Sequence, residues 1–404
     1  MSIGKRRYMK KQSNAPQIRF QNFEDEWVKQ SLGKTVEIIM GQSPDSKNYT
    51  DNPNDYILVQ GNADMQNGRV IPRVWTTQVT KLAEKGDLIL SVRAPVGDIG
   101  KTDYNVVLGR GVAAIKGNEF LFQLLTKMKQ SHYWSKFSTG STFESINSND
   151  IKSAEIYLPS IEEQSAIGSL FRTLDDLLAS YKDNLANYQS LKTTMLSKMF
   201  PKAGQTVPEI RLDGFEGDWE LLEINDLADD FQSGGTPKTN VQEYWNGNIP
   251  WIQSSDLETN CLFETKVQKS ISEKGLKNSS AKIIPKDSIA VVTRVGVGKL
   301  AVMRHEYATS QDFLSFSNLK SNIEFTAYLL YRLLQKEVTQ LQGTSIKGIT
   351  KVELLSKKVL IPSLPEQQAI GAYFSNLDNL INSYQEKISQ LETLKKKFLQ
   401  DMFI

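Results

Sequence analysis

Two long segments of the chain carry apolar residues at alternating intervals of four and three positions. The first segment covers residues 158–200 and the second covers 361–403. An apolar repeat that averages 3.5 residues indicates a coiled-coil seam rather than the broader face of an ordinary amphipathic helix. The predicted seam residues are Ile167, Phe171, Leu174, Leu178, Tyr181, Leu185, Tyr188, Met195 and Met199 in the first segment, and Ile370, Phe374, Leu377, Ile381, Tyr384, Ile388, Leu391, Phe398 and Met402 in the second.

Two polar features accompany this seam. Lys192 and Lys395 each occupy a seam position that is otherwise apolar. A lysine there can fix the register between helices, or it can extend its ammonium to solvent at a loose end, and the pattern leaves both possibilities open. Each segment also begins with Ser-x-x-Glu, at 160–163 and 363–366, which predicts a capping box at the start of a helix.

The residues before each segment have a different pattern. Short β-rich runs, such as 87–94 and 288–295, alternate with Gly- and Asn-rich turns. An amphipathic helix is predicted near the end of each region, at 119–130 and 324–335. These patterns predict two mixed α/β domains, which we name head 1 (residues 18–157) and head 2 (residues 210–360).

The chain is internally duplicated. Residues 158–200 align without a gap to 361–403 with 18 identities over 43 positions. IRFQNFEDEW at 18–27 matches IRLDGFEGDW at 210–219, and GSTFESI at 140–146 matches GTSIKGI at 343–349. The order is therefore head, helix, head, helix, with the helices more similar to each other than the heads.

A helix of about 39 residues is about 58 Å long, and its seam has to be buried. The second helix is its expected partner, in antiparallel orientation. We therefore predict an α+β fold in which a long antiparallel two-helix coiled coil separates two α/β domains, with a pseudo-two-fold internal repeat. The predicted segments are a basic N-terminal arm at 1–17, either solvated or binding phosphates, head 1 at 18–157, a first spacer helix at 158–200, a linker at 201–209, head 2 at 210–360 and a second spacer helix at 361–404.

Composition narrows the class of protein. A net charge of +2 does not by itself indicate a nucleic-acid-binding protein. A single cysteine, Cys261, excludes an internal disulfide framework and favours a reducing compartment. We expect no membrane span and no secretory signal, because no apolar run of sufficient length occurs and none follows the basic N-terminus.

The expected chemistry is non-catalytic. GVGK at 296–299 lacks the flanking residues of a phosphate-binding loop, and two histidines and one cysteine do not supply the usual zinc spacings. We interpret the carboxylate pairs at 162–163 and 175–176 as a solvated face or a partner contact. Arg93 and Arg294 each stand three positions before a Val-Gly pair at the end of a predicted strand. Each could contact a phosphate or a guanine edge, or pair with a surface carboxylate.

The duplicated helix motif is specific. LPSIEEQSAIGSLFRTLDDLL at 158–178 and IPSLPEQQAIGAYFSNLDNLI at 361–381, together with GGTPKT at 234–239 and EYW at 243–245, resemble the specificity subunit of a type I restriction–modification enzyme. The resemblance covers nearly the whole chain. Head 1 departs from the pattern, because it has MGQSPDSKNY at 40–49 where head 2 has the more typical GGTPKT.

This resemblance implies a function. Each head would be a target-recognition domain that reads one half of a bipartite, asymmetric site in double-stranded DNA. The helix pair would set the gap between the halves and dock two methyltransferase subunits, and two motor-nuclease subunits would complete a cytoplasmic complex. This chain would hold no cofactor, since S-adenosylmethionine, ATP and Mg would be bound by the partners.

Residues are assigned to these roles as follows. The expected DNA contacts are Gln42, Ser43, Lys47, Arg93, Arg110, Thr142, Thr236, Lys238, Arg294, Gln311 and Lys347. The expected partner-docking residues of the spacer helices are Glu163, Gln164, Ile167, Phe171, Glu366, Gln367, Ile370 and Phe374. The alternative function is a coiled-coil scaffold or adaptor with two ligand-binding heads and no role with DNA, which explains the helix pair equally well.

Overall fold

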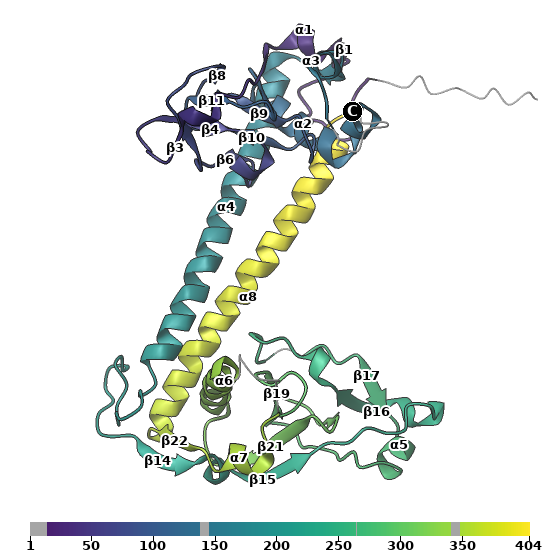
Figure 1. Ribbon diagram of the computed structural model, residues 1–404. Coiled ribbons are helices and arrows are strands. Elements are labelled where there is room, and N and C mark those ends of the chain that lie inside the picture. The colour runs from purple at the N-terminus through teal and green to yellow at the C-terminus, as the bar shows by residue number, and fades with distance from the viewer. Residues whose placement is uncertain (1–13, 138–144, 264, 341–347) are drawn as a thin grey trace, which may run out of the picture. The chain divides into compact units, whose positions relative to one another are not determined.

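The computed structural model describes residues 14–137, 145–263, 265–340 and 348–404. The chain forms two compact units, and two long helices, α4 (Ile161–Lys198) and α8 (Leu364–Asp401), contribute to both (Figure 1). Unit 1 comprises residues 1–182 and 387–404, and unit 2 comprises 183–386. Among the described helices, none combines the length and apolar character that a membrane span requires.

Head 1 lies in unit 1 and contains two main sheets. One has the strand order β2-β12-β9-β10-β6-β5 and the other β3-β7-β4-β11-β8. The strands are β1 (Val28–Ser31), β2 (Ile38–Met40), β3 (Tyr49–Thr50), β4 (Tyr56–Val59), β5 (Met65–Gln66), β6 (Arg69–Val70), β7 (Trp75–Thr76), β8 (Leu82–Ala83), β9 (Leu88–Ser91), β10 (Ile99–Lys101), β11 (Val106–Leu108), β12 (Val112–Ile115) and β13 (Glu155–Leu158), and the helices are α1 (Leu32–Thr35), α2 (Glu119–Gln130) and α3 (Ser148–Lys152).

Head 2 lies in unit 2 and repeats this plan with fewer strands. A sheet of order β15-β21-β18-β19 corresponds to β2-β12-β9-β10, and a smaller sheet has the order β17-β16-β20. The strands are β14 (Glu220–Glu223), β15 (Ala228–Ser233), β16 (Trp245–Ile252), β17 (Lys269–Ile271), β18 (Ser288–Val292), β19 (Leu300–Met303), β20 (Ala308–Thr309), β21 (Phe313–Leu319) and β22 (Lys358–Ile361), and the helices are α5 (Glu273–Lys277), α6 (Ile323–Gln340) and α7 (Lys351–Leu355).

The predicted mixed α/β heads and long helices are confirmed. The helix predicted at 119–130 coincides with α2, and the one predicted at 324–335 lies within the longer α6. Each head closes with a two-stranded ladder, β1 with β13 and β14 with β22, immediately before its long helix. The core of each unit extends from the sheet onto that helix through Phe171 in unit 1 and Phe374 in unit 2, both fully buried.

The antiparallel pairing of the long helices is confirmed within each unit. In unit 1, Lys395 Nζ of α8 lies 2.5 Å from Asp175 Oδ1 of α4. In unit 2, Lys192 Nζ of α4 lies 2.5 Å from Asp378 Oδ1 of α8. The seam lysines therefore pair with carboxylates of the opposite helix and do not extend to solvent, which decides the question that the sequence left open.

A residue of each head completes these ion pairs. Gln123 of α2 donates a 2.9 Å hydrogen bond to Asp175, and Tyr328 of α6 donates one of 2.7 Å to Asp378. Gln123 and Tyr328 occupy the same position of the matching helices. The expectation that Asp175 belongs to a solvated face or a partner contact is thus wrong, because a neighbouring helix of the same chain supplies its counter-ion.

Candidate nucleic-acid interface

Three backbone turns meet at one end of a sheet in each head, β2-β12-β9-β10-β6-β5 in head 1 and β15-β21-β18-β19 in head 2. In head 1 they are the turn after β2, the turn after β9 and the turn before β12. Backbone hydrogen bonds join them, from Gly41 N to Val112 O at 3.0 Å and from Val92 N to Gly111 O at 2.9 Å. Head 2 joins its β18 and β21 turns in the same way, from Thr293 N to Asp312 O at 2.7 Å.

A glycine permits the closest of these approaches. A Cβ atom on Gly41 would lie 2.0 Å from the carbonyl oxygen of Gly109. One on Gly234 would lie 2.0 Å from Thr309 Oγ1. No side chain fits such spaces, so both loops begin with glycine, followed two residues later by Ser43 or Thr236.

Predicted contact residues of two different turns lie together in both heads. Ser43 Oγ accepts a 3.0 Å hydrogen bond from the backbone N–H of Arg110. Thr236 Oγ1 donates a 2.5 Å hydrogen bond to Gln311 Oε1. Because Arg110 and Gln311 each lie two residues before the corresponding strand, they occupy equivalent positions of the two heads.

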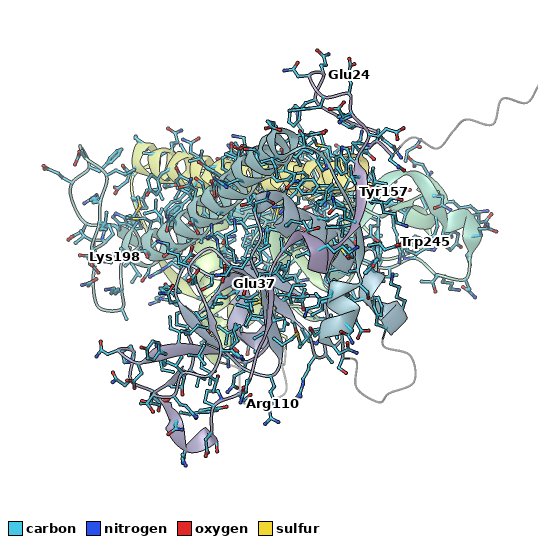
Figure 2. The ribbon with its side chains drawn as sticks, turned by 90° about the horizontal axis from the view of Figure 1, so that it is seen from above. Glu24, Glu37, Arg110, Tyr157, Lys198 and Trp245 are labelled. Carbon is cyan, nitrogen blue, oxygen red and sulfur yellow. The ribbon has the colours of Figure 1, made fainter. Side chains whose placement is uncertain are left out.

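Three of the described arginines differ from the others in their side-chain contacts. Within the described residues, the guanidinium groups of Arg93, Arg110 and Arg294 form no ion pair or hydrogen bond, and all three residues are exposed (Figure 2 shows Arg110 at the surface). The sequence left open whether Arg93 and Arg294 pair with carboxylates; no such pair forms among the described residues. The remaining described arginines all have partners: Arg19, Arg69, Arg73, Arg172, Arg211, Arg304 and Arg332.

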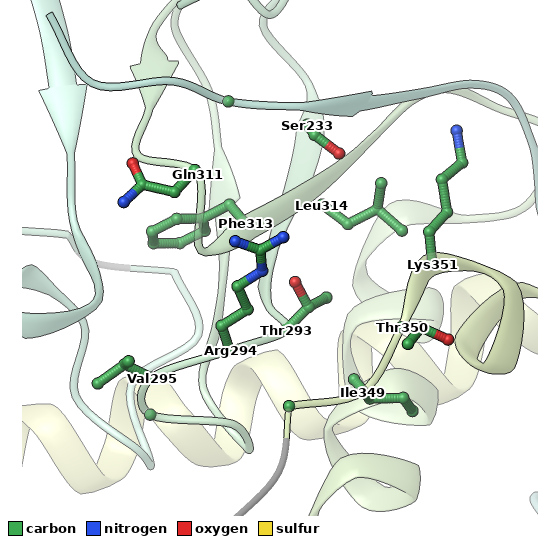
Figure 3. A pocket seen from close by; sticks show the side chains of 13 residues that line it. Ser233, Thr293, Arg294, Val295, Gln311, Phe313, Leu314, Ile349, Thr350 and Lys351 are labelled. Atoms are coloured by element: carbon green, nitrogen blue, oxygen red, sulfur yellow. The ribbon is translucent and has the colours of Figure 1, made fainter.

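In head 2 the turns border a pocket of about 810 Å³. Figure 3 shows the guanidinium of Arg294 between Gln311 and the start of α7. Lys351 at the start of α7 also lines the pocket, and its ammonium donates a 3.1 Å hydrogen bond to the carbonyl oxygen of Phe231. The pocket thus gathers a guanidinium, a carboxamide and an ammonium on one surface, and these groups are donors suited to base edges and phosphates.

The remaining predicted DNA contacts are Gln42, Lys47, Thr142, Lys238 and Lys347. Gln42 and Lys238 are exposed in the two corresponding loops. Lys47 is also exposed but forms a 3.2 Å ion pair with Asp45. Thr142 and Lys347 lie outside the described residues. Across the described ranges, no group of three His, Cys, Asp or Glu side chains is placed to hold a metal ion.

The residues assigned to partner docking lie inside the chain. None of the eight is more than 6% exposed, so their side chains are not a free docking surface. Gln164 accepts a hydrogen bond from Asn118, and Gln367 accepts one from the backbone of Asn322. The four apolar members belong to the unit cores: Ile167, Phe171, Ile370 and Phe374.

The two glutamates of that group have arginine partners. Arg19 donates two hydrogen bonds of 2.7 Å to Glu163, and Arg211 donates two of 2.8 Å to Glu366. These bonds raise the pKa of both arginines above the ordinary value. Ser160 Oγ accepts from Glu163 N at 3.3 Å, as half of the predicted capping box, but the carboxylate of Glu163 binds Arg19. The interpretation of Glu163 as a solvated or partner-facing residue is therefore wrong. The repetition of both Arg and Glu in the two halves was the signal that could have identified these pairs.

Comparison with known proteins agrees with this architecture. The family model described as Type I restriction modification DNA specificity domain matches twice, at residues 24–187 and 216–393. These matches cover most of the chain, which therefore belongs to this family.

Individual relatives are more distant. The chain is 28% identical over 194 residues to the MjaIX specificity subunit of a type I restriction enzyme from Methanocaldococcus jannaschii, covering 46% of this chain and 44% of that one. It is 27% identical over 190 residues to the EcoR124I/EcoR124II specificity subunit from Escherichia coli, covering 45% and 46%. The matched stretches thus span less than half of the length of these relatives.

The fold extends over the whole chain. The crystal structure of the S subunit of a type I restriction-modification system from M. genitalium aligns with a TM-score of 0.64 at 15% identity, over 96% of this chain and 99% of that one. At this level of identity the likeness concerns the fold. The scaffold alternative receives no support from these comparisons.

Proposed function

We propose that this chain is the DNA specificity subunit of a type I restriction–modification complex. Each head reads one half of a bipartite, asymmetric site in double-stranded DNA, and the chain itself catalyses no reaction. The observation that carries the proposal is the set of exposed guanidinium groups of Arg93, Arg110 and Arg294 at turns of the heads, which have no partner among the described residues. An arginine without a protein partner is available for a guanine edge or a phosphate.

Half-site binding tests this proposal. Arg294→Ala should weaken binding to one half-site and Arg93→Ala to the other, each by about 1–3 kcal/mol if the arginine contacts a base. Arg69→Ala is the matched control, because Arg69 pairs with Asp103 away from these turns. If neither variant changes affinity for the bipartite site, head-specific DNA reading is wrong.

We also propose that each unit docks one methyltransferase subunit. Because the eight buried residues cannot form the contact, exposed leucines of the helix pair take this role. Leu177 and Leu394 in unit 1 are 36% and 39% exposed, and Leu191 and Leu380 in unit 2 are 36% and 42% exposed. Each leucine directly precedes a seam residue, a position that lies on the same side of the seam in both antiparallel helices.

The duplication supports two copies of one partner. Leu177 and Leu380 are equivalent positions of the repeat, as are Leu191 and Leu394, so each unit presents the same apolar pair. Leu177→Asp with Leu394→Asp should lower the ratio of methyltransferase to this chain from two to one in native mass spectrometry. A ratio that stays at two would contradict docking at these leucines.

The partners would supply the chemistry that this chain lacks. In this proposal the methyltransferase subunits bring S-adenosylmethionine, and two motor-nuclease subunits bring ATP and Mg. The helix pair sets the gap between the half-sites. Inserting one heptad into each long helix adds about 10 Å, so the preferred gap should grow by about three base pairs. An unchanged gap would contradict this role.

A further inference from the structure

Arg110 and Gln311 are structurally equivalent, yet they differ chemically. In head 1 the register pairs Ser91 with Val112, and in head 2 the same strands pair Val292 with Phe313. Counting back two residues from Val112 and from Phe313 gives Arg110 and Gln311. The equivalence therefore follows from hydrogen-bonded strand registers, although the loops themselves share little sequence.

Matching hydrogen bonds hold Arg110 and Gln311 at equivalent places in the two heads. In head 1 the turn after β2 contacts Arg110 through the hydroxyl group of Ser43, and in head 2 the turn after β15 contacts Gln311 through the hydroxyl group of Thr236. In both heads the nearby strand end also carries an arginine, Arg93 or Arg294, whose guanidinium has no partner within the described ranges. The arginine that follows β9 or β18 is thus common to the two heads, whereas the residue two positions before β12 or β21 differs between them.

The free donor and acceptor groups of the two side chains differ in base preference. Ser43 holds the backbone N–H of Arg110, and the guanidinium has no partner among the described residues. Two parallel guanidinium N–H groups match the O6 and N7 acceptors of guanine in the major groove. In contrast, a carboxamide both donates and accepts, which matches N7 and the N6 amino group of adenine.

The carboxamide of Gln311 is oriented for this role. Thr236 Oγ1 occupies one side of Oε1 at 2.5 Å, while the second lone pair of Oε1 and the Nε2 amino group have no partner among the described residues. Both Arg110 and Gln311 are exposed. Since the hydroxyl group fixes the carboxamide before DNA arrives, less rotational freedom is lost on binding.

We propose that residues 110 and 311 determine the base at one equivalent position of each half-site, with Arg110 selecting guanine and Gln311 selecting adenine. This inference rests on the proposed DNA-reading function and names the residues that make its two halves differ at one position. A two-fold repeat with identical side chains here would favour matching half-sites at this position. The Arg/Gln difference makes the half-sites differ there.

An exchange experiment tests the inference. The full chain, co-purified with the methyltransferase subunit of its host, selects duplexes from a pool with randomised half-sites, and the bound DNA is sequenced. Arg110→Gln should change one guanine to adenine in a single half-site, and Gln311→Arg should make the reverse change in the other half-site. Discrimination at the changed position should be about 10- to 100-fold. Arg69→Gln, an exposed arginine of head 1 outside the three turns, is the control and should leave the selected sequence unaltered.

The possible outcomes distinguish a failure of the base assignment from a failure of the proposed DNA-reading function. If Arg110→Gln weakens binding to all sequences equally, residue 110 contacts a phosphate and the inference is overturned. It is also overturned if both variants select the wild-type sequence. If the wild-type complex selects no sequence at all, the proposed function itself fails. Thermal unfolding of each variant, expected to match the wild type because both residues are exposed, shows that any change in selection is not a folding defect.

Discussion

Arg19 holds Glu163 with hydrogen bonds of 2.7 Å from Nε and from Nη2 to the two carboxylate oxygens. The side chain of Glu163 is 1% exposed and that of Arg19 14%. Arg211 and Glu366 repeat the arrangement in unit 2. In each unit a buried ion pair therefore joins the first residues of a head to the start of the long helix that follows it, about 150 positions later in the chain.

Removing one partner of this ion pair should lower the free energy of unfolding. Glu163→Gln leaves a nearly buried guanidinium without its counter-ion, so we expect the free energy of unfolding to fall by about 3 kcal/mol. Urea denaturation measures the loss, and hydrogen exchange should localise it to the start of α4. Glu162→Gln, at the exposed neighbouring position, is the control. Equal losses for the two variants would contradict a specific role of the Arg19 pair.

A glycine in each long helix should resist replacement by alanine. A Cβ on Gly168 would lie 2.9 Å from Glu119 Cβ and 3.2 Å from Phe120 N, and Gly371 meets α6 at similar distances. Helix propensity alone favours Gly168→Ala by about 1 kcal/mol. Overpacking against α2 opposes it by about 1–3 kcal/mol, so we expect a net loss in thermal unfolding. Ser169→Ala, on the exposed side of the same turn, should be neutral or slightly stabilising. A stabilised Gly168→Ala would refute the close approach of α2.

The seam lysines should behave as members of ion pairs. Lys192→Met leaves the buried carboxylate of Asp378 with the hydroxyl of Tyr328 as its one side-chain donor among the described residues, so a loss of about 3 kcal/mol is expected. The double variant Lys192→Met/Asp378→Leu should recover most of this loss, because neither charge remains. Urea denaturation of both variants, compared with the exposed Lys396→Met, measures the difference. A double variant no more stable than the single one would show that the loss arises from packing.

Alkaline pH should lower the folding stability of head 2. Burial raises the pKa of Tyr307 to about 12, although Ser288 and Ser315 hydrogen-bond to its hydroxyl group. Because the unfolded tyrosine titrates near 10, the folded state binds this proton more tightly. The stabilisation is complete below pH 10 and is lost as the pH rises to about 12, with a total of about 3 kcal/mol. Urea denaturation across this range should show a shallower loss for Tyr307→Phe than for wild type, whereas the exposed Tyr56→Phe should follow the wild type. Identical slopes for wild type and Tyr307→Phe would exclude this contribution.

The positions of Arg93 and Arg294 at corresponding turns could be predicted from local sequence. A strand, an arginine and a Val-Gly turn recur in order in both heads, and such short-range signals are present in the linear pattern. Their contact with DNA stays a prediction. The equivalence of Arg110 and Gln311 was not visible, because it depends on strand registers between segments that are distant in sequence.

The assignment of docking residues failed for a different reason. Glu163, Gln164 and Phe171 recur in the second helix as Glu366, Gln367 and Phe374, and this repetition suggested a shared surface for a partner. The structure buries all of them, since a repeated head also needs the same internal contacts with its helix. Repetition alone does not distinguish a core position from an interface position.

By itself, the sequence determined the duplication, the presence of the two long helices and the apolar repeat along them, because a heptad period is set by local backbone geometry and recurs every two turns. Only the tertiary structure decided which charges meet: Arg19 with Glu163, Lys192 with Asp378 and Lys395 with Asp175. The energy of such a pair depends on removal from water and on hydrogen-bond geometry, which arise only when distant segments pack together.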